Sequence, residues 1–266
     1  MRYFIQNLRN NLDFWFRKKI KLSRGNYCPS NEPKDKLFDK LNDQKKLPAS
    51  EKEKEYLEKY HLERLKDNSK KRIYLENLSM LEFLENYFDL KEANSELNVL
   101  DIGSKNWFYA EGEYNFFKYN SFEKNISLTG IEIDSARLYI DLYSRYDYAS
   151  YHIRNLENAE YIAGDFLLHQ KQYDYITWFF PFVTKEPLLN WGLPLKFFKP
   201  LKMLEHAYSL LKPDGTLIIV NQGKNEYIEQ ENLLVKLDIP YSKKGLFRSN
   251  FIDFSFERYV TLVHKQ

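Results

Sequence analysis

The chain has 266 residues, enough for one large domain or for one domain with a smaller appended region. Hydrophobic residues make up 43% of the chain and charged residues 29%, which excludes a disordered polymer and predicts a packed core. Lys and Arg (40) nearly balance Asp and Glu (38), and the net charge of +2 excludes a global attraction to nucleic acid or membrane. Any such contact has to be local.

Cysteine and histidine form no pattern typical of disulfide or metal chemistry. The single cysteine, Cys28, excludes an intrachain disulfide and a cysteine-rich zinc site, and it is consistent with a reducing cytoplasm. His152, His169 and His206 lack the spacing of metal ligands, so we expect no metal site and a structural role for each. No run of 18 apolar residues occurs, and the start of the sequence lacks the features of a signal peptide. We therefore expect a cytoplasmic protein without a transmembrane helix.

The first 24 residues predict a basic amphipathic helix. Apolar residues recur there at intervals of three and four, and seven basic residues accompany a single acid, Asp13. The basic residues are Arg2, Arg9, Arg17, Lys18, Lys19, Lys21 and Arg24. We expect the helix to dock its apolar face on the main domain; contact with a membrane surface or with nucleic acid remains open.

The next segments predict a linker followed by two helices. Residues 25–50 contain one glycine and three prolines among polar residues, which is typical of a long loop. Ser50, with Glu53 three residues later, matches a capping box that opens a helix. Apolar residues at helical spacing predict a second helix over about Lys71–Phe88. Together these segments define a helical N-terminal region over residues 1–90.

The residue pattern changes after Leu97 from helical spacing to short apolar runs. Helices are expected between them, from about Ser135, over 201–211 and over 225–237. The predicted strands are 97–102, 127–133, 161–165, 173–180, 216–220, 242–247 and 258–264, and the last two are close enough to form a hairpin. Alternating strands and helices are typical of a doubly wound parallel sheet, so we expect an α/β domain over residues 91–266.

Several polar residues and a glycine lie at the carboxyl ends of the predicted strands. Parallel strands joined by right-handed crossovers end at the same edge of the sheet, where ligands of such folds bind. Gly103, Glu132 and Asp165 fall at this edge, as do the segments after Phe180 and Val220. We therefore expect these residues to converge on a ligand site.

The loop after the first predicted strand limits the choice of ligand. Dinucleotide binding requires the three glycines of G-x-G-x-x-G, whereas Gly103 is followed here by Ser104-Lys105-Asn106-Trp107. The P-loop motif G-x-x-x-x-G-K-[ST] does not occur either. The loop therefore argues against NAD, FAD and P-loop nucleotides, and it favours a cofactor without a pyrophosphate.

From about Leu97 onward, the sequence resembles the class I S-adenosylmethionine-dependent methyltransferases in four segments. These are Val99-Leu-Asp-Ile-Gly103 for the first motif of the family, Gly130-Ile-Glu132 for the second, Gly164-Asp165 for the third, and Leu211-Lys-Pro-Asp-Gly-Thr-Leu217 before the fifth strand. The resemblance implies a doubly wound, Rossmann-like, mostly parallel seven-stranded sheet with an antiparallel C-terminal strand. It also implies S-adenosyl-L-methionine as the cofactor.

The same resemblance implies roles for individual residues. The loop around Gly103 and Ser104 wraps the methionine part of the cofactor. Glu132 accepts hydrogen bonds from the ribose hydroxyls, because a carboxylate can accept two such bonds. Asp165 or its neighbour Phe166 contacts the adenine amino group.

Each acid in the predicted cofactor site also has a structural interpretation. Asp101, at a strand position where the family often has an acid, is alternatively a buried carboxylate bonded to the loop backbone. Glu132 is alternatively a surface acid beside a helix start, although Asp134 fits the capping position better. Asp165 is alternatively a turn residue.

The methyl acceptor is expected beyond the fourth and fifth strands. Phe180 and Pro181 follow the fourth strand, and the segment shares only a Pro-aromatic pair with the motif of amino-group methyltransferases. Asn221 and Gln222 follow the fifth strand. These four residues are the candidates for binding the acceptor, which the sequence does not identify.

Two functions follow from these features. The first is an S-adenosylmethionine-dependent methyltransferase with an added helical N-terminal region. The second is a catalytically silent methyltransferase-like protein that binds RNA or a protein partner. The single glycine of the first motif and the basic segment 1–24 motivate this second hypothesis.

Overall fold

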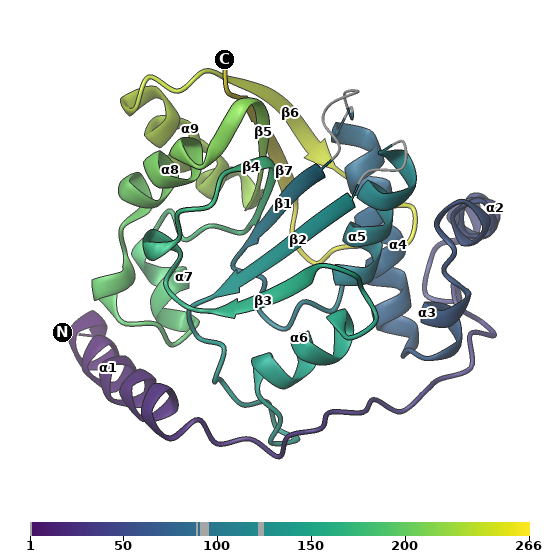
Figure 1. Ribbon diagram of the computed structural model, residues 1–266, viewed down its shortest axis with the longest axis horizontal. Helices are drawn as coiled ribbons and strands as arrows, with labels where there is room; N and C mark the ends of the chain where they lie inside the picture. The colour runs from purple at the N-terminus through teal and green to yellow at the C-terminus, as the bar shows by residue number, and fades with distance from the viewer. Residues whose placement is uncertain (1, 89, 91–95, 122–124) are drawn as a thin grey trace.

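The computed structural model describes residues 2–88, 90, 96–121 and 125–266. Its strands are β1 (Glu96–Ile102), β2 (Asn125–Glu132), β3 (Ala159–Ala163), β4 (Tyr173–Phe179), β5 (Leu211–Gln222), β6 (Tyr241–Phe247) and β7 (Arg258–His264). Within these residues they form one seven-stranded sheet in the order β3-β2-β1-β4-β5-β7-β6 (Figure 1). Strands β1 to β5 pair in parallel, whereas β7 runs antiparallel to β5 and β6. The predicted α/β sheet with an antiparallel C-terminal strand is confirmed.

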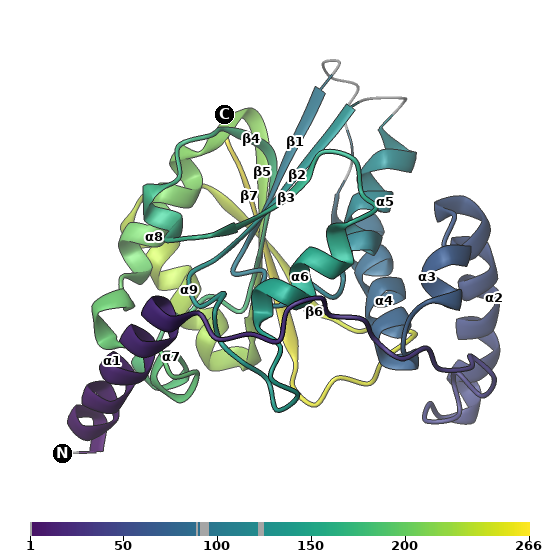
Figure 2. The ribbon, with the colours of Figure 1, turned by 60° about the horizontal axis from the view of Figure 1, so that its bottom comes forward.

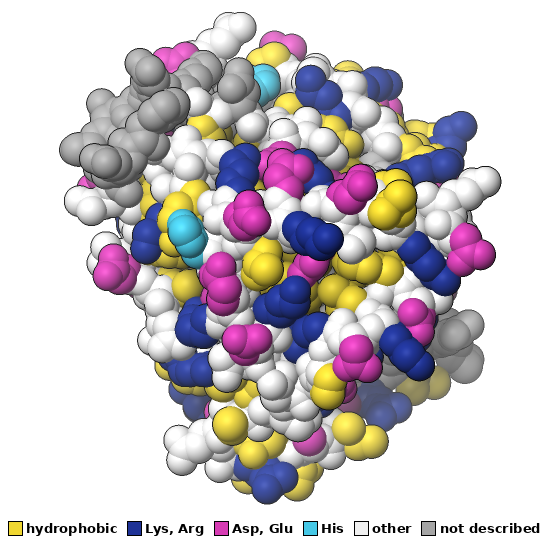
Figure 3. Space-filling view, turned by 90° about the vertical axis from the view of Figure 1, so that its right-hand side faces the viewer, with side chains coloured by type: hydrophobic (Ala, Val, Ile, Leu, Met, Phe, Trp, Pro, Cys, Tyr) yellow, Lys and Arg dark blue, Asp and Glu magenta, His cyan; other side chains and the backbone are white. Residues whose placement is uncertain are grey.

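Helices cover both faces of the sheet. They are α1 (Arg2–Ile20), α2 (Asp43–Tyr60), α3 (Glu63–Asp67), α4 (Lys71–Tyr87), α5 (Ala110–Asn120), α6 (Arg145–Ile153), α7 (Lys185–Asn190), α8 (Pro200–Ser209) and α9 (Gly223–Lys236). Helices α8 and α9 lie on one face, α4, α5 and α6 lie on the other, and α2 and α3 form an outer layer (Figure 2). On the surface that α2 and α3 cover, basic and acidic side chains are interspersed (Figure 3). None of the described helices combines the length and the apolarity that crossing a membrane requires.

Apolar side chains fill the space on both sides of the sheet. One cluster joins Tyr56 of α2 and Phe117 of α5 with Val99 of β1. A second cluster joins Leu204 of α8 with Ile219 of β5. The central strands are therefore buried on both faces, which explains their nearly continuous apolar sequences.

The helix predicted to open at Ser50 begins earlier in the chain. Helix α2 starts at Asp43, and the side chain of Asn42 before it accepts a hydrogen bond from the Lys45 N–H at 3.0 Å. Ser50 lies inside the helix, and Glu53 is buried there. The predicted capping box is wrong because Asn42 already satisfies the helix start.

The helix predicted from about Ser135 begins later, at Arg145. Residues 133–144 form turns and an isolated bridge. The hydroxyl of Ser144 accepts the Asp147 N–H at 3.1 Å, and the Asp147 carboxylate accepts the Ser144 N–H at 2.6 Å. This reciprocal pair is a capping box, and it fixes the start of α6.

Helix α1 lies against α7 with its polar side. The amide of Asn10 donates to the carbonyl of Leu189 at 2.9 Å, and Arg17 forms an ion pair with Asp134 at 2.9 Å. Phe14 is buried in this contact, whereas the other large apolar side chains of α1 are exposed. The expectation that this helix docks its apolar face is therefore wrong.

Trp107 fills the space beneath the loop after β1. Its indole is fully buried, and Nε1 donates to the carboxylate of Glu113 at 3.1 Å. A Cβ added to Gly130 on β2 would lie 2.6 Å from the ring of Trp107. Gly130 therefore allows the loop to pack closely on the neighbouring strand.

The substitution Gly130→Ala is expected to lower the free energy of unfolding by about 1–3 kcal/mol, the usual cost of overpacking a core. Gly164→Ala is the matched control, because its added Cβ would meet only the side chain of Ile162, at 3.5 Å. Urea unfolding of both variants measures the difference. Equal free energies of unfolding in the two variants would contradict the close packing of Trp107 on Gly130.

Candidate functional site

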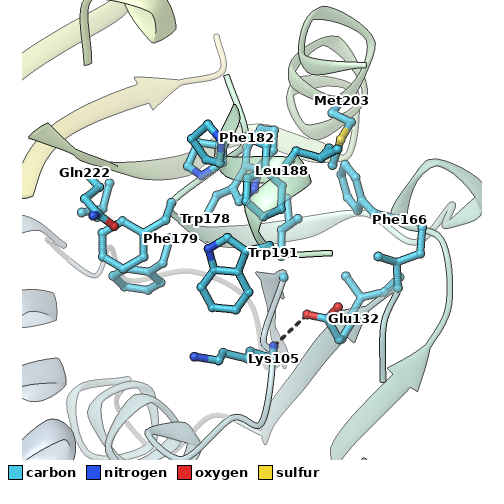
Figure 4. A pocket seen from close by; sticks show the side chains of 18 of the residues that line it. Lys105, Glu132, Phe166, Trp178, Phe179, Phe182, Leu188, Trp191, Met203 and Gln222 are labelled. Carbon is cyan, nitrogen blue, oxygen red and sulfur yellow. Dashed lines mark hydrogen bonds between the residues drawn. The ribbon is translucent and has the colours of Figure 1, made fainter. Parts of the chain in front are cut away.

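A cavity of about 410 Å³ lies at the carboxyl ends of β1, β2 and β4 (Figure 4). The order of the strands reverses between β1 and β4, and doubly wound sheets bind ligands at such a point. The volume falls within the range of small-molecule sites. The predicted site residues that line the cavity are Gly103, Glu132, Asp165, Phe166, Phe180, Pro181 and Gln222.

The other predicted site residues do not line the cavity. Asp101, Ser104 and Asn221 are fully buried. The hydroxyl of Ser104 donates to the carbonyl of Asp101 at 2.9 Å and so supports the turn after β1. The structure thus brings together the residues at the strand ends, and it keeps these three within the protein interior.

The carboxylate of Glu132 accepts three hydrogen bonds from the protein itself. Its Oε1 accepts the Asp134 N–H at 2.7 Å and the side chain of Arg145 at 3.2 Å. Its Oε2 accepts the Lys105 N–H at 3.1 Å (Figure 4). The ion pair with Arg145 is almost fully buried. Since a carboxylate has about four acceptor positions, one remains for a ligand.

Asp134, the expected helix cap, instead ties α1 to the end of β2. Its two carboxylate oxygens accept Nε and Nη2 of Arg17 at 2.9 and 3.0 Å, a bidentate pair. The side chain of Asp134 is only 2% exposed. The capping prediction is wrong because α6 begins beyond these turns, at Arg145.

Trp191 projects into the cavity from the turn after α7, between Phe179 and Lys105 (Figure 4). The Nζ of Lys105 lies 4.6 Å from the centroid of the indole, and Cζ of Arg145 lies 5.4 Å from it. These separations are typical of cation–π contacts. Burial, followed by the charge of Arg145, lowers the pKa of Lys105 to about 8. The indole therefore closes part of the cavity beside Glu132.

The end of the cavity near Gln222 is aromatic and cationic (Figure 4). Arg258 of β7 lies there, with its Cζ 5.3 Å from the ring centroid of Phe180. Burial lowers the pKa of Arg258 to about 10, and burial raises the pKa of Glu76 on α4. This end therefore combines flat apolar surfaces with two partly buried groups of opposite charge type, Glu76 and Arg258.

Sequence reasoning missed Trp191, Arg145 and Arg258. Trp191 belongs to a segment between β4 and α8 that carries no motif. The position of Arg145 had a signal, because Ser144 and Asp147 form a capping-box pattern that starts a helix there. Arg258 has no local signal, since only the antiparallel pairing of β7 with β5 brings it to the cavity.

Two buried carboxyl groups meet at the hydroxyl of Thr177 beneath the loop after β1. The hydroxyl of Thr177 lies 3.0 Å from the Asp101 carboxyl and 2.8 Å from that of Glu113, and Tyr109 donates to Asp101 at 2.7 Å. Burial raises the pKa of Asp101 to about 7 and raises that of Glu113 well above its ordinary value. Neighbouring buried carboxyls do not both ionise, so the pair holds a proton at neutral pH.

The raised pKa of Asp101 predicts a pH dependence of stability. The folded protein holds a proton on Asp101, whereas the unfolded chain releases it above the ordinary pKa of this residue, 3.8. The stabilisation is therefore complete below pH 3.8, and it is lost as the pH rises through about 7. Between about pH 5 and pH 8, the free energy of unfolding of the wild type should therefore fall by roughly 2 kcal/mol more than that of Asp101→Asn. Urea denaturation across this range measures both proteins, and falls of equal size would contradict the raised pKa of Asp101.

His152 is buried, and His169 and His206 are partly buried. Burial lowers the pKa of His152 to about 3, Nε2 of His169 lies 2.6 Å from the Tyr173 hydroxyl, and Nε2 of His206 lies 2.9 Å from the His169 carbonyl. Among the residues that the structure describes, no three or more His, Cys, Asp or Glu side chains are arranged to hold a metal ion.

No protein-family model and no curated protein matches the sequence. Several solved structures are similar to the chain. A SAM-dependent methyltransferase from Aquifex aeolicus is 19% identical with a TM-score of 0.46, over 71% of this chain and 89% of its own. A methyltransferase from Pyrococcus furiosus is 19% identical with a TM-score of 0.48, over 71% and 82% of the two chains. A putative class I S-adenosylmethionine-dependent methyltransferase from Listeria monocytogenes is 11% identical with a TM-score of 0.49, over 72% of this chain and 59% of its own.

At these identities and TM-scores, the similarities establish no activity. The assignment of the fold rests on the strand order and on the reversal of β7 among the described strands. On that topology, the chain has the fold of the class I S-adenosylmethionine-dependent methyltransferases.

Proposed function

We propose that this protein is a cytoplasmic S-adenosylmethionine-dependent methyltransferase with an unidentified acceptor. The observation that best supports this function is the position of the cavity at the switch point between β1 and β4. The ends of neighbouring strands contribute Gly103, Glu132 and Asp165 to its wall. The sequence motifs assign the same three residues to the cofactor. The compartment is supported by the single cysteine, Cys28, which is free and exposed.

The residues at this end of the cavity fit the cofactor. A Cβ added to Gly103 would meet no atom within 4 Å, so the turn leaves open space. Glu132 retains an acceptor position for a ribose hydroxyl. Within the described part of the chain, the Asp165 carboxylate accepts only the Leu167 N–H, at 3.0 Å, and can accept the adenine amino group as well. The buried ring of Phe166 offers an apolar wall for the base.

When bound, S-adenosyl-L-methionine supplies a methyl group on a positively charged sulfonium. Transfer of this group is an in-line displacement, so the protein contributes mainly by positioning the acceptor and excluding water. The rings of Trp178, Phe179 and Phe180 line the cavity, where aromatic faces can lie against the cation. Trp191 contributes its indole to the wall of the cavity on the side of Lys105.

A second function is supported by the hydrogen bonding of Glu132. Three donors of the protein already occupy most of its acceptor positions, and the indole of Trp191 lies beside it. This arrangement also suits a methyltransferase-like protein that has lost catalysis and binds RNA or a protein partner. The two functions differ in whether the cavity binds the cofactor.

Calorimetric titration with S-adenosylhomocysteine separates the two functions. We expect saturable binding by the 266-residue protein, because the acceptors at the strand ends match the ribose and the adenine. Absence of binding at millimolar ligand, in a preparation that unfolds cooperatively on heating, would exclude the proposed enzyme. That outcome would leave the binding protein as the function to pursue.

The variant Asp165→Asn is expected to bind S-adenosylhomocysteine about tenfold more weakly, because one acceptor oxygen is replaced by a donor that faces the adenine amino group. Asp238→Asn is the matched control, since Asp238 is exposed after α9 and does not line the cavity. The same titration compares both variants with the wild type. An unchanged affinity in Asp165→Asn would remove this residue from the site.

A further inference from the structure

The face of α1 that points to solvent is the apolar one. We call it the outer face of α1, and its side chains are each at least half exposed: Phe4 (72%), Ile5 (61%), Leu8 (56%), Leu12 (54%), Trp15 (53%), Phe16 (50%) and Ile20 (54%). Single exposed apolar residues are ordinary, but a contiguous apolar stripe along a helix marks an interaction surface.

The opposite face of α1 prevents the helix from turning this stripe inward. Asn10 donates to the carbonyls of Leu189 and Leu193 at 2.9 and 3.1 Å. Arg17 binds the buried carboxylate of Asp134 through two hydrogen bonds. Rolling the helix would leave Asp134 buried without this cation, which is unfavourable. The exposure of the outer face is therefore a fixed feature of the fold.

Basic residues border the outer face of α1. Successive residues of a helix are about 100° apart, which places Lys18 at one edge of the stripe and Arg9 at the other. Both side chains are exposed, and Arg9 forms an exposed ion pair with Asp13 at 3.5 Å. Lys19 is exposed on the outer face itself, near the end of the helix. Segment 1–24 holds seven basic residues and one acid, in contrast to the interspersed charges on the surface of α2 and α3 (Figure 3).

The apolar surface continues beyond α1. Leu22 is 63% exposed, and the backbone N–H of Arg24 donates to the carbonyl of Leu142 at 3.2 Å. This bond holds the turn that contains Ile140 and Leu142 against Arg24, four residues after the end of α1, and both side chains are exposed. A second part of the chain thus presents exposed apolar side chains close to the segment that follows α1.

We propose that the outer face of α1 docks on an anionic lipid bilayer, with the helix lying flat at the interface. Apolar side chains with Trp15 and Phe16 among them enter the boundary of the acyl chains, and basic residues at the edges meet anionic headgroups. RNA fits this surface poorly, because the exposed centre of the stripe is apolar rather than cationic. A second copy of the chain is the other possible occupant, and the measurement of a dimer below tests it. The inference does not depend on methyl transfer.

Flotation with lipid vesicles tests this proposal. The 266-residue protein should bind vesicles of phosphatidylglycerol and phosphatidylcholine at least tenfold more tightly than vesicles of phosphatidylcholine alone, and high salt should weaken the binding. The double variant Leu8→Glu/Leu12→Glu should lose binding at least tenfold. The matched control is Ile228→Glu/Val235→Glu on α9, where both side chains are also exposed, and it should bind as the wild type does.

Charge and folding are tested separately. Lys18→Gln/Lys19→Gln keeps the apolar stripe and should weaken binding to the anionic vesicles by about fivefold per charge. Thermal unfolding should be the same in all variants, because only exposed positions change. Unchanged vesicle binding by Leu8→Glu/Leu12→Glu would overturn the proposal. RNA retention without vesicle binding would also overturn it, as would a dimer that this double variant abolishes in the absence of vesicle binding.

Discussion

Three separate segments of the chain meet at the buried carboxylate of Glu132. The loop after β1 donates through Lys105 N–H, the turn after β2 donates through Asp134 N–H, and α6 contributes Arg145. An ionised carboxylate taken out of water costs several kcal/mol, and these donors offset that cost. The loop, the turn and the helix are consequently fixed relative to the sheet, and so is the cavity between them. The candidate cofactor site depends on this one set of interactions.

The strands could be predicted because their signal is local. Apolar runs such as that of β1 report burial on both faces, and the sequence locates six of the seven strands of the described sheet to within two residues. Strand β5 is the exception: it begins at Leu211 rather than at Thr216, and it includes Pro213 and Gly215, which are atypical of strand interiors. The helix starts at Ser50 and Ser135 were wrong because a polar residue before a helix marks a start only when its side chain accepts a backbone N–H two or three residues later. Asn42 and Ser144 hold those positions.

Glu132 and Asp165 could be placed at the cavity from sequence, since parallel strands end at one edge. The residues that surround them in the cavity, Trp191 and Arg258, could not be placed there from sequence. Trp191 reaches the cavity because α7 lies against α1, and Arg258 reaches it because β7 pairs antiparallel to β5. Contacts of this kind join residues distant in sequence, and no local pattern encodes them. Trp107 shows the same limit, because its burial depends on the missing Cβ of Gly130 in another strand.

The hydrogen bond between α1 and the end of α7 has a consequence for the order in which the molecule folds. Asn10 and Leu189 are separated by 179 positions, so this contact closes one of the longest loops in the chain. Long-range contacts of this kind are slow to form, whereas the sheet can pair before them. Helix α1 is therefore among the last elements of the described fold to find its place. Until it docks, the turn that carries Trp191 lacks its outer support, and the cavity wall is the final part of the fold to be completed.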